Sequence, residues 1–297
     1  MKQSAQEKAS GVEAIDDSSG GLSEDQGGTS SARGSLRPDS YLRSLEKGLA
    51  VLHAFSPSKP QLTITEVAHR TGQDRAAARR AMLTLTQLGY LVQEGKTFRL
   101  TARVLGFSYQ YLAALPFWQQ AHPVLEALSD EMNETISIGV LDGQDVVFVL
   151  RVPAKRLLTF DPSTGTRVPA QVHSIGHVLL AGLQDQEFER FISNTTFTRF
   201  TAASIVNDYD LRCVVATARQ QNWAFASSQH EENLGGVSVP LRDARGQMLA
   251  ALNVNFIMDS DSRRRAVEDL LPRLQLAARR IQEAMPEQAI NRGRAYR

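Results

Sequence analysis

The sequence predicts an α+β protein with an N-terminal winged helix-turn-helix and a C-terminal domain built on a mostly antiparallel sheet. Three observations carry this prediction. Residues 62–100 read as helix, turn, helix and short hairpin. After residue 118, helices and strands alternate without a regular βαβ rhythm. Positive charge is concentrated in the first of these two regions.

The helix-turn-helix is expected to begin at Thr63. Thr63 and Glu66 have the spacing of a capping box, and Gly72 is placed to end the helix that they start. Asp74 can cap a second helix, whose apolar residues share one stripe. That stripe contains Ala78, Ala81, Met82, Leu85 and Leu88.

The opposite side of the second helix carries arginines. Arg79 and Arg80 point away from the apolar stripe, and Arg75 lies in the first turn. A short helix with an apolar back and an arginine front suits the major groove of duplex DNA. The alternative is an ordinary amphipathic helix with a solvated charged face, because such short patterns also arise by accident.

A hairpin completes the winged fold. Residues 90–93 and 97–100 alternate in the manner of strands and flank a glycine-containing turn at residues 94–96. Lys96 and Arg99 are expected at or near its tip, within reach of phosphate oxygens. The predicted DNA contacts are therefore Thr63, Thr65, Arg75, Arg79, Arg80, Lys96 and Arg99.

The distribution of charge supports a polyanionic partner. The 297 residues carry a net charge of +1, yet residues 35–110 hold eleven Lys and Arg against five Asp and Glu, a net +6. The first 34 residues carry −3 and the remainder −2. Charge gathered on the segment with the candidate reading helix favours binding to double-stranded DNA.

The cysteine content and the hydropathy of the chain indicate the cellular compartment in which we expect the protein. Cys213 is the single cysteine, so one chain can form neither a disulfide nor a cysteine-based zinc cluster. No stretch of about eighteen apolar residues is present, and the N-terminus lacks the basic start and apolar core of a signal peptide. We therefore expect a cytoplasmic, nucleoid-associated protein with no membrane contact.

Five segments are expected along the chain. Residues 1–38 are rich in Ser, Gly and acidic groups and are predicted to be a disordered tail. The winged helix-turn-helix should occupy residues 39–102, a linker helix 103–117, the C-terminal domain 118–286 and a flexible tail 287–297. A first helix at residues 41–55 should pack behind the helix-turn-helix through one apolar face. That face contains Leu42, Leu45, Leu49, Leu52 and Phe55.

The linker helix, at about residues 104–115, is too apolar to be a free connector. It either packs back on its own domain or contributes to a contact between subunits. We favour the second reading, because one helix in one groove gives little specificity and a two-fold dimer doubles the footprint. A homodimer or tetramer is expected.

The C-terminal domain should begin with a helix at residues 124–133 and end with a long helix at 263–285, bent at Pro272. The expected strands are residues 135–140, 146–152, 224–227, 236–242 and 248–256. The expected internal helices are residues 174–182, 185–193 and 208–221.

Several short segments, in a fixed order, resemble the IclR family of bacterial transcription regulators over about residues 40–285. They are SLEKGL at 44–49, LGY at 88–90, GTRVPA at 165–170, LLA at 179–181 and GVSVPLRD at 236–243. The resemblance implies a GAF-like effector-binding domain behind the winged helix, assembled as dimers or tetramers. The paired arginines and the GTRVPA run are most similar to regulators of aromatic-acid catabolism, such as those for protocatechuate and p-hydroxybenzoate.

The resemblance also implies an effector pocket, lined by the loop and helix after GTRVPA and by a later hairpin. Mapped by motif, this gives His173, Ser174, Ile175, Gly235, Gly236, Asn253 and Asn255. Some relatives carry an acid and a cysteine where this chain has Ala226 and Gly236, so the ligand of those relatives does not carry over. The expected effector is a small organic acid, benzoate-like, and no metal or cofactor is expected.

The residues themselves support an acid-binding pocket. Asn253 and Asn255 alternate with apolar residues, so both amides face one side of a strand, where they meet a ligand or, alternatively, solvent. Arg151, at the end of a strand, can pair with a carboxylate or form a structural salt bridge. His173 and His177 are four residues apart, but no third ligand lies at a metal-binding spacing.

No catalytic residues are predicted. The chain lacks a glycine-rich phosphate loop and a nucleophile–base signature, which argues against an enzyme that metabolises a small molecule through its C-terminal domain. That enzyme remains the alternative function, and an interaction module using the winged domain as a scaffold is a third. The main hypothesis is a ligand-responsive regulator of an aromatic-acid catabolic operon.

Overall fold

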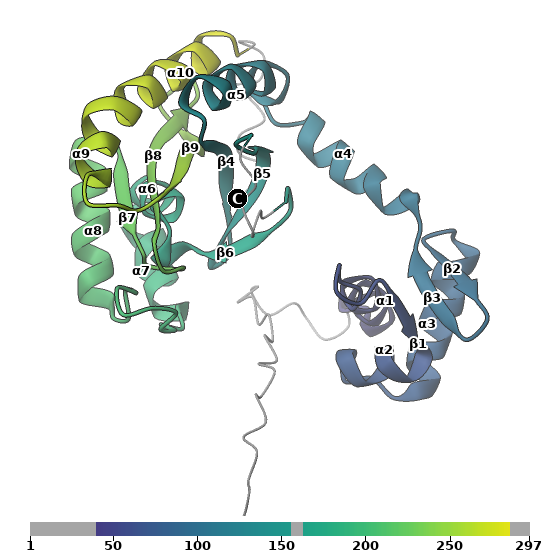
Figure 1. The fold of residues 1–297 in the computed structure, drawn as a ribbon. Helices are drawn as coiled ribbons and strands as arrows, with labels where there is room; N and C mark the ends of the chain where they lie inside the picture. Colours follow the sequence, from purple (N-terminus) through teal and green to yellow (C-terminus); the bar gives the residue numbers. More distant parts are fainter. Residues whose placement is uncertain (1–39, 156–162, 286–297) are drawn as a thin grey trace, which may run out of the picture. The chain divides into compact units, whose positions relative to one another are not determined.

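The computed structural model describes residues 40–155 and 163–285 (Figure 1). The tails predicted at residues 1–38 and 287–297 lie outside this described part. The N-terminal region contains a three-stranded antiparallel sheet in the order β1-β3-β2 beside three helices. Its elements are α1 (Arg43–His53), β1 (Gln61–Thr63), α2 (Ile64–Thr71), α3 (Arg75–Gln87), β2 (Leu91–Glu94) and β3 (Thr97–Leu100).

Local capping sets the boundaries of α2 and α3 as the sequence predicts. The Thr63 hydroxyl accepts a hydrogen bond from the Glu66 backbone N–H at 3.3 Å, and the Glu66 carboxylate accepts from the Thr63 N–H at 2.8 Å. Gly72 ends α2 with φ +63°, and Asp74 accepts from the Ala77 N–H at 2.7 Å to start α3. Both predicted helices of the motif are confirmed, each held by its own cap.

The first helix differs from the prediction. Leu42, Leu45 and Leu49 are 66%, 59% and 51% exposed, so this part of the predicted face does not pack behind the motif, whereas Leu52 and Phe55 do pack against its core. Val51 is fully buried instead, because α1 turns its Val51 side toward α3. Leu88, expected on the buried stripe of α3, is also half-exposed, because it lies in the turn that ends this helix. An apolar face of a helix does not by itself show what covers it.

A short helix joins the winged region to the next domain. The 3-10 turn η2 (Ala102–Val104) leads into α4 (Leu105–Ala113), which matches the predicted linker helix. The following helix α5 (Trp118–Met132) starts six residues before the prediction. It contains Pro123, a residue that usually marks the first turn of a helix rather than its interior.

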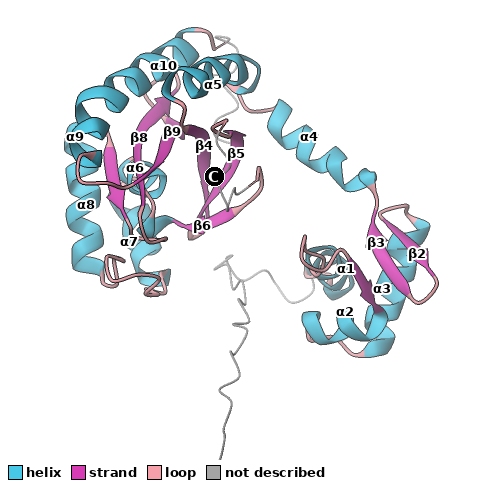
Figure 2. Cartoon of the chain, in the orientation of Figure 1, coloured by secondary structure: helices cyan, strands magenta, loops and turns pink. Residues whose placement is uncertain are grey.

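The C-terminal domain is a six-stranded antiparallel sheet in the order β6-β5-β4-β9-β8-β7, covered by helices on both faces (Figure 2). The antiparallel architecture is confirmed, with the short strand β6 unforeseen. The strands are β4 (Thr135–Asp142), β5 (Asp145–Val152), β6 (Arg167–Pro169), β7 (Ala224–Ser227), β8 (Leu234–Arg242) and β9 (Met248–Ile257). The internal helices are η3 (Ala170–Val172), α6 (Ser174–Ala181), α7 (Asp185–Asn194) and α8 (Asp208–Gln221).

Two apolar cores lie on the two faces of this sheet. One core packs α5 and the last helix against Ile136, Leu252 and Val254, and the other packs α6, α7 and α8 against Phe148 and Ala251. The alternation of these residues along the strands explains how one sheet serves both cores.

The last helix is interrupted rather than continuous. It consists of α9 (Ser262–Arg265), a π turn η4 (Ala266–Leu270) and α10 (Leu271–Glu283). Pro272, where a bend was predicted, is the second residue after this π turn and lacks the N–H that a regular helix would use. Among the described residues, no helix is long and apolar enough to cross a membrane.

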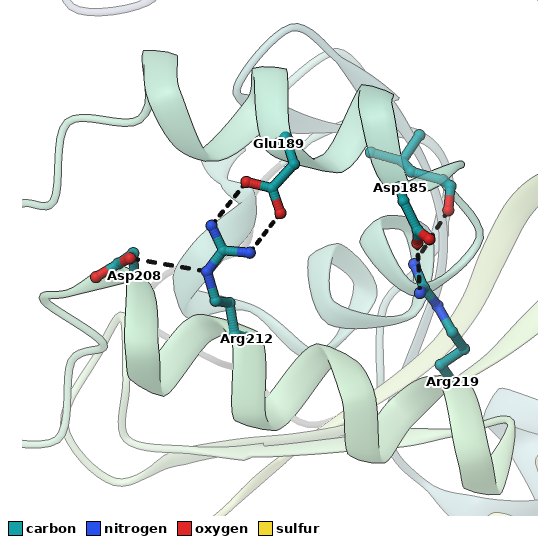
Figure 3. A network of polar contacts seen from close by, with 6 residues as sticks. Asp185, Glu189, Asp208, Arg212 and Arg219 are labelled. Atoms are coloured by element: carbon teal, nitrogen blue, oxygen red, sulfur yellow. Dashed lines mark hydrogen bonds and ion pairs between the residues drawn. The ribbon is translucent and has the colours of Figure 1, made fainter.

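Ion pairs join α7 to α8 (Figure 3), and a hydrogen bond joins α8 to the end of α6. Arg212 on α8 makes a bidentate pair with Glu189 on α7, and its guanidinium lowers the pKa of that carboxyl. Arg219 contacts Asp185 at 3.0 Å and donates to the backbone oxygen of Ala181 at 3.1 Å. The C-terminal end of α6 is therefore tied to both following helices.

Candidate DNA-binding and effector-binding sites

The reading face of α3 is well defined. Arg75, Arg79 and Arg80 are exposed, while Ala78 and Met82 on the opposite side are completely buried. The buried side anchors α3 in the winged core with Val67 and Phe98. Three guanidinium groups thus project from a rigid helix, which is the arrangement that base-edge and phosphate contacts in a major groove require.

The wing is a two-residue hairpin. Glu94 pairs with Thr97 across a turn made by Gly95, at φ +62°, and Lys96, which is exposed at the tip. Arg99 is also exposed, but its Nε donates to the Glu94 carboxylate at 2.8 Å. A phosphate would compete with Glu94 for Arg99 and would meet Lys96 without such competition.

The two threonines at the start of α2 differ in availability. The Thr63 hydroxyl donates to the Glu66 carboxylate at 2.8 Å in addition to capping the helix. Thr65 is exposed, so its hydroxyl is open to a phosphate. Among the predicted DNA contacts, Thr63 therefore caps α2, as its spacing from Glu66 already suggested.

The C-terminal domain contains a row of polar side chains across four neighbouring strands. Ser238 on β8, Asn253 on β9, Ser137 on β4 and Arg151 on β5 are consecutive partners in the sheet register. Ser137, Ser238 and Asn253 are completely buried. The alternative that Asn253 faces solvent is therefore wrong, and Asn255 is only 8% exposed.

Sequence reasoning missed Ser137 and Ser238. Each stands between two large apolar residues of a strand, Ile136 and Ile138 or Val237 and Val239. Alternation therefore placed both hydroxyls on one face, and this signal could have revealed them. The two serines extend the predicted pocket from β9 to both of its neighbouring strands.

The start of α6 joins this polar row. The Ser174 and Ser238 hydroxyl oxygens are 2.8 Å apart, and the Asn253 amide nitrogen donates to each, at 3.1 and 3.0 Å. The Asn253 carbonyl oxygen Oδ1 is buried and has no hydrogen-bond partner within residues 40–155 and 163–285. A buried acceptor without a donor costs about 1–3 kcal/mol, so this atom is suited to receive one from a ligand.

Gly236 makes room for this cluster. A Cβ at Gly236 would lie 2.7 Å from Asn255 Oδ1 and 3.1 Å from Ser174 Oγ. Gly235 faces the opposite way, toward Phe256 and Met258. Ile175 packs in the apolar core under the sheet, so neither Gly235 nor the Ile175 side chain joins the polar row.

Arg151 ends the row on β5. Its Nη1 donates to the Ser137 hydroxyl at 3.0 Å, and its guanidinium lies 5.3 Å from the centre of the Phe148 ring. The same ring meets His173 edge-on at 5.7 Å. A flat guanidinium held beside an aromatic ring can receive the carboxylate of an aromatic acid.

The two histidines of the α6 region have structural contacts. His173 Nδ1 accepts from the Ile175 N–H at 3.2 Å and so caps α6, and His177 Nε2 donates to the Gln171 carbonyl at 2.9 Å. Burial lowers the pKa of His173 to about 3 and that of His177 to about 4, so both are neutral near pH 7. Among the described residues, no group of three or more His, Cys, Asp or Glu could hold a metal ion.

The lowered pKa values of these histidines predict that the C-terminal domain becomes less stable to unfolding as the pH decreases. The unfolded chain binds their protons below about pH 6.5, whereas the folded domain does not until pH 3–4, so stability falls as the pH decreases through this window. At pH 5 the loss should be about 2 kcal/mol per histidine. Urea unfolding at pH 7 and pH 5, followed by the fluorescence of Trp118 and Trp223, measures it.

His177→Gln should remove about half of the pH dependence that the two buried histidines contribute. An identical pH dependence in His177→Gln and the parent protein would contradict the burial argument.

An exposed arginine helix on a winged core, linked by a helix to a sheet domain with a buried polar site, defines a ligand-responsive DNA-binding regulator. Comparison with known families agrees. The IclR helix-turn-helix domain matches residues 44–95, and the bacterial transcriptional regulator IclR C-terminal domain matches residues 109–283. The chain belongs to the IclR family of bacterial transcriptional regulators.

Individual relatives are similar over most of their length. The Pca regulon regulatory protein of Pseudomonas putida is 35% identical over 82% of this chain and 83% of its own. The p-hydroxybenzoate hydroxylase transcriptional activator of Acinetobacter baylyi is 34% identical over 83% and 93%. The crystal structure of a transcriptional regulator from Rhodococcus sp. RHA1 matches with a TM-score of 0.72 at 35% identity, covering 82% of this chain and 98% of that one. The matched families and relatives are transcriptional regulators, not enzymes.

Proposed function

We propose that this protein controls an operon for aromatic-acid catabolism, in the cytoplasm and on the nucleoid, and that a hydroxylated aromatic acid is its effector. The observation that carries the proposal is the polar row, which has a guanidinium at one end and a buried acceptor without a donor further along. The names of the Pseudomonas putida and Acinetobacter baylyi relatives support the same class of pathway.

The polar row offers one partner for the carboxylate and another for the hydroxyl of a hydroxylated aromatic acid. A carboxylate would pair with Arg151, while the ring would lie near Phe148 and His173. A ring hydroxyl would donate to Asn253 Oδ1 and satisfy its buried lone pair. A ligand without a hydroxyl would leave that acceptor unsatisfied.

The experiment is a binding panel on the full chain. Thermal shift and calorimetry with 4-hydroxybenzoate, 3,4-dihydroxybenzoate, benzoate and glyoxylate should rank the hydroxylated rings first. Benzoate should bind about tenfold more weakly, since one lost hydrogen bond to a buried acceptor is worth about 1–1.5 kcal/mol. Stabilisation by glyoxylate alone would overturn the aromatic assignment.

Two variants locate the ligand. Arg151→Gln should weaken binding of every aromatic carboxylate, whereas Arg280→Gln, an exposed arginine on α10, should change nothing. Equal affinity in Arg151→Gln and the parent protein would remove Arg151 from the site.

The exposed apolar residues of α1 and α4 support assembly into dimers. Leu45 and Leu49 on α1, and Leu42 directly before it, are more than half exposed. So are Leu105, Phe107 and Tyr109 in α4. A regulator that reads two half-sites of an operator needs a two-fold partner. Exposed apolar helix faces are the surfaces that two subunits are expected to bury against each other. We therefore propose that α1 and α4 form the contact of a homodimer. This dimer exists alone or pairs with a second dimer to form a tetramer.

The dimer is tested by placing charge on α1. Leu45→Glu with Leu49→Glu should convert the protein to monomers in light scattering, because paired carboxylates would have to be buried at the contact. Leu276→Glu, at an exposed leucine of α10, is the matched control and should leave the mass unchanged. A dimer that persists with both substitutions on α1 would exclude this face.

A further inference from the structure

A cavity lies apart from the polar row. It has a volume of about 390 Å³ and reaches from the chain after α4 to α6, α7 and the start of β9. None of the polar-row residues lines it. Its size falls within the range of pockets that hold small organic molecules.

The position of this cavity relates it to both functional parts of the chain. One wall is formed by Leu115 and Phe117, which directly follow the linker helix. The other wall includes Leu179, near the C-terminal end of α6, while Ser174 at the opposite end of the same helix contacts the polar row. Eight helical residues span about 12 Å, so one rigid helix separates the two sites.

The wall on the α6 side is held firmly. Arg219 donates to the backbone oxygens of Ala181 and Leu183, both at 3.1 Å. It also pairs with Asp185, as Figure 3 shows. These contacts anchor the turn between α6 and α7, where Leu183 lines the cavity. A ligand would therefore meet a preformed surface.

One cationic side chain of the cavity is available to an anionic ligand. Asp142 is paired with Arg167 at 2.7 Å, and the Glu187 carboxylate accepts from the Gln184 N–H at 3.1 Å. The Arg190 side chain, in contrast, makes no hydrogen bond or ion pair among the described residues. An apolar floor with one available guanidinium fits a molecule with an apolar body and a single carboxylate.

We propose that this cavity is a second small-molecule site, which takes an apolar monocarboxylate through Arg190. Such a ligand contacts the end of the linker and the α6–α7 turn together, and so adds a control point between the effector site and the DNA-binding domain. Binding of a ligand in this cavity does not depend on the proposed effector. Its effect on DNA binding, in contrast, rests on the proposed regulatory function.

The test uses 2-naphthoate as the probe, with calorimetry on the full chain. The affinity should fall at least tenfold in Arg190→Gln, because the carboxylate loses its partner. The uncharged 2-naphthalenemethanol should bind the parent and Arg190→Gln proteins equally. Arg280→Gln is the matched control and should bind 2-naphthoate as the parent does.

Two further variants separate this site from the first. Leu183→Trp, which fills the cavity, should abolish 2-naphthoate binding while its melting temperature shows that it folds. Arg151→Gln should keep 2-naphthoate binding, whatever its effect on hydroxybenzoates. Unchanged affinity in Arg190→Gln, loss of the probe in Arg151→Gln, or no binding by the parent protein at millimolar probe would each overturn the second site.

Discussion

Replacing Arg79 and Arg80 together by alanine should abolish specific operator binding. Both side chains are exposed on α3, whose other face is locked into the winged core. A bidentate contact from arginine to guanine is worth about 1–3 kcal/mol. Two lost contacts per half-site predict a decrease in affinity of at least about 100-fold, which fluorescence anisotropy with a selected duplex measures.

The control for this pair lies in the effector domain. Arg279 and Arg280 are also adjacent, helical and exposed, so their double replacement by alanine removes the same net charge. It should leave operator affinity within about threefold of the parent value. Equal losses in the two double variants would mean that α3 is not the reading helix and that only overall charge matters.

Gly176→Ala should disable the effector domain. A Cβ at Gly176 would lie within 2.6 Å of two backbone carbons of Ala170 and closer still to its carbonyl oxygen. Backbone in η3 cannot move without displacing the start of α6, which carries Ser174 and the His173 cap. We expect a loss of about 3 kcal/mol or more in stability, together with the loss of effector binding.

The measurement for Gly176→Ala is urea unfolding followed by tryptophan fluorescence. Trp118 and Trp223 are the only tryptophans and both belong to the C-terminal domain, so the signal reports that domain. Gly48→Ala in α1, where nothing lies within 4 Å of the new Cβ, is outside the domain that this signal reports and should leave the unfolding curve unchanged. A Gly176→Ala domain as stable as the parent would show that η3 yields easily.

Local rules account for the parts of the fold that the sequence could predict. The capping residues Thr63 and Asp74 begin their helices where the spacing requires, and alternation along the strands gave the antiparallel sheet. The failures concern contacts between distant residues. The leucines of α1 form an apolar face, yet only the fold shows that Val51, not Leu45, meets the core.

In the candidate site, too, local sequence rules predicted some residues, while others depend on contacts between distant segments. Alternation placed Asn253 on the ligand side of its strand, but Ser238 and Ser137 join it through strand register, which depends on residues far apart in sequence. The same register shows that Gly235 faces away from the site and Gly236 faces into it. The cavity beside the linker is lined by the linker, a hairpin and two helices, a combination that no single segment could indicate.

The most direct test of a ligand-switched DNA reader is transcription in vitro. The template carries an operator selected by the parent protein from a random duplex library, and the variable is the presence of 4-hydroxybenzoate or the hydroxylated acid that the binding panel ranks first. The account predicts a change in transcript of at least about fivefold, in either direction, that disappears in Arg151→Gln and in the Arg79→Ala, Arg80→Ala variant. Unchanged transcription by the parent protein with the acid bound would contradict it.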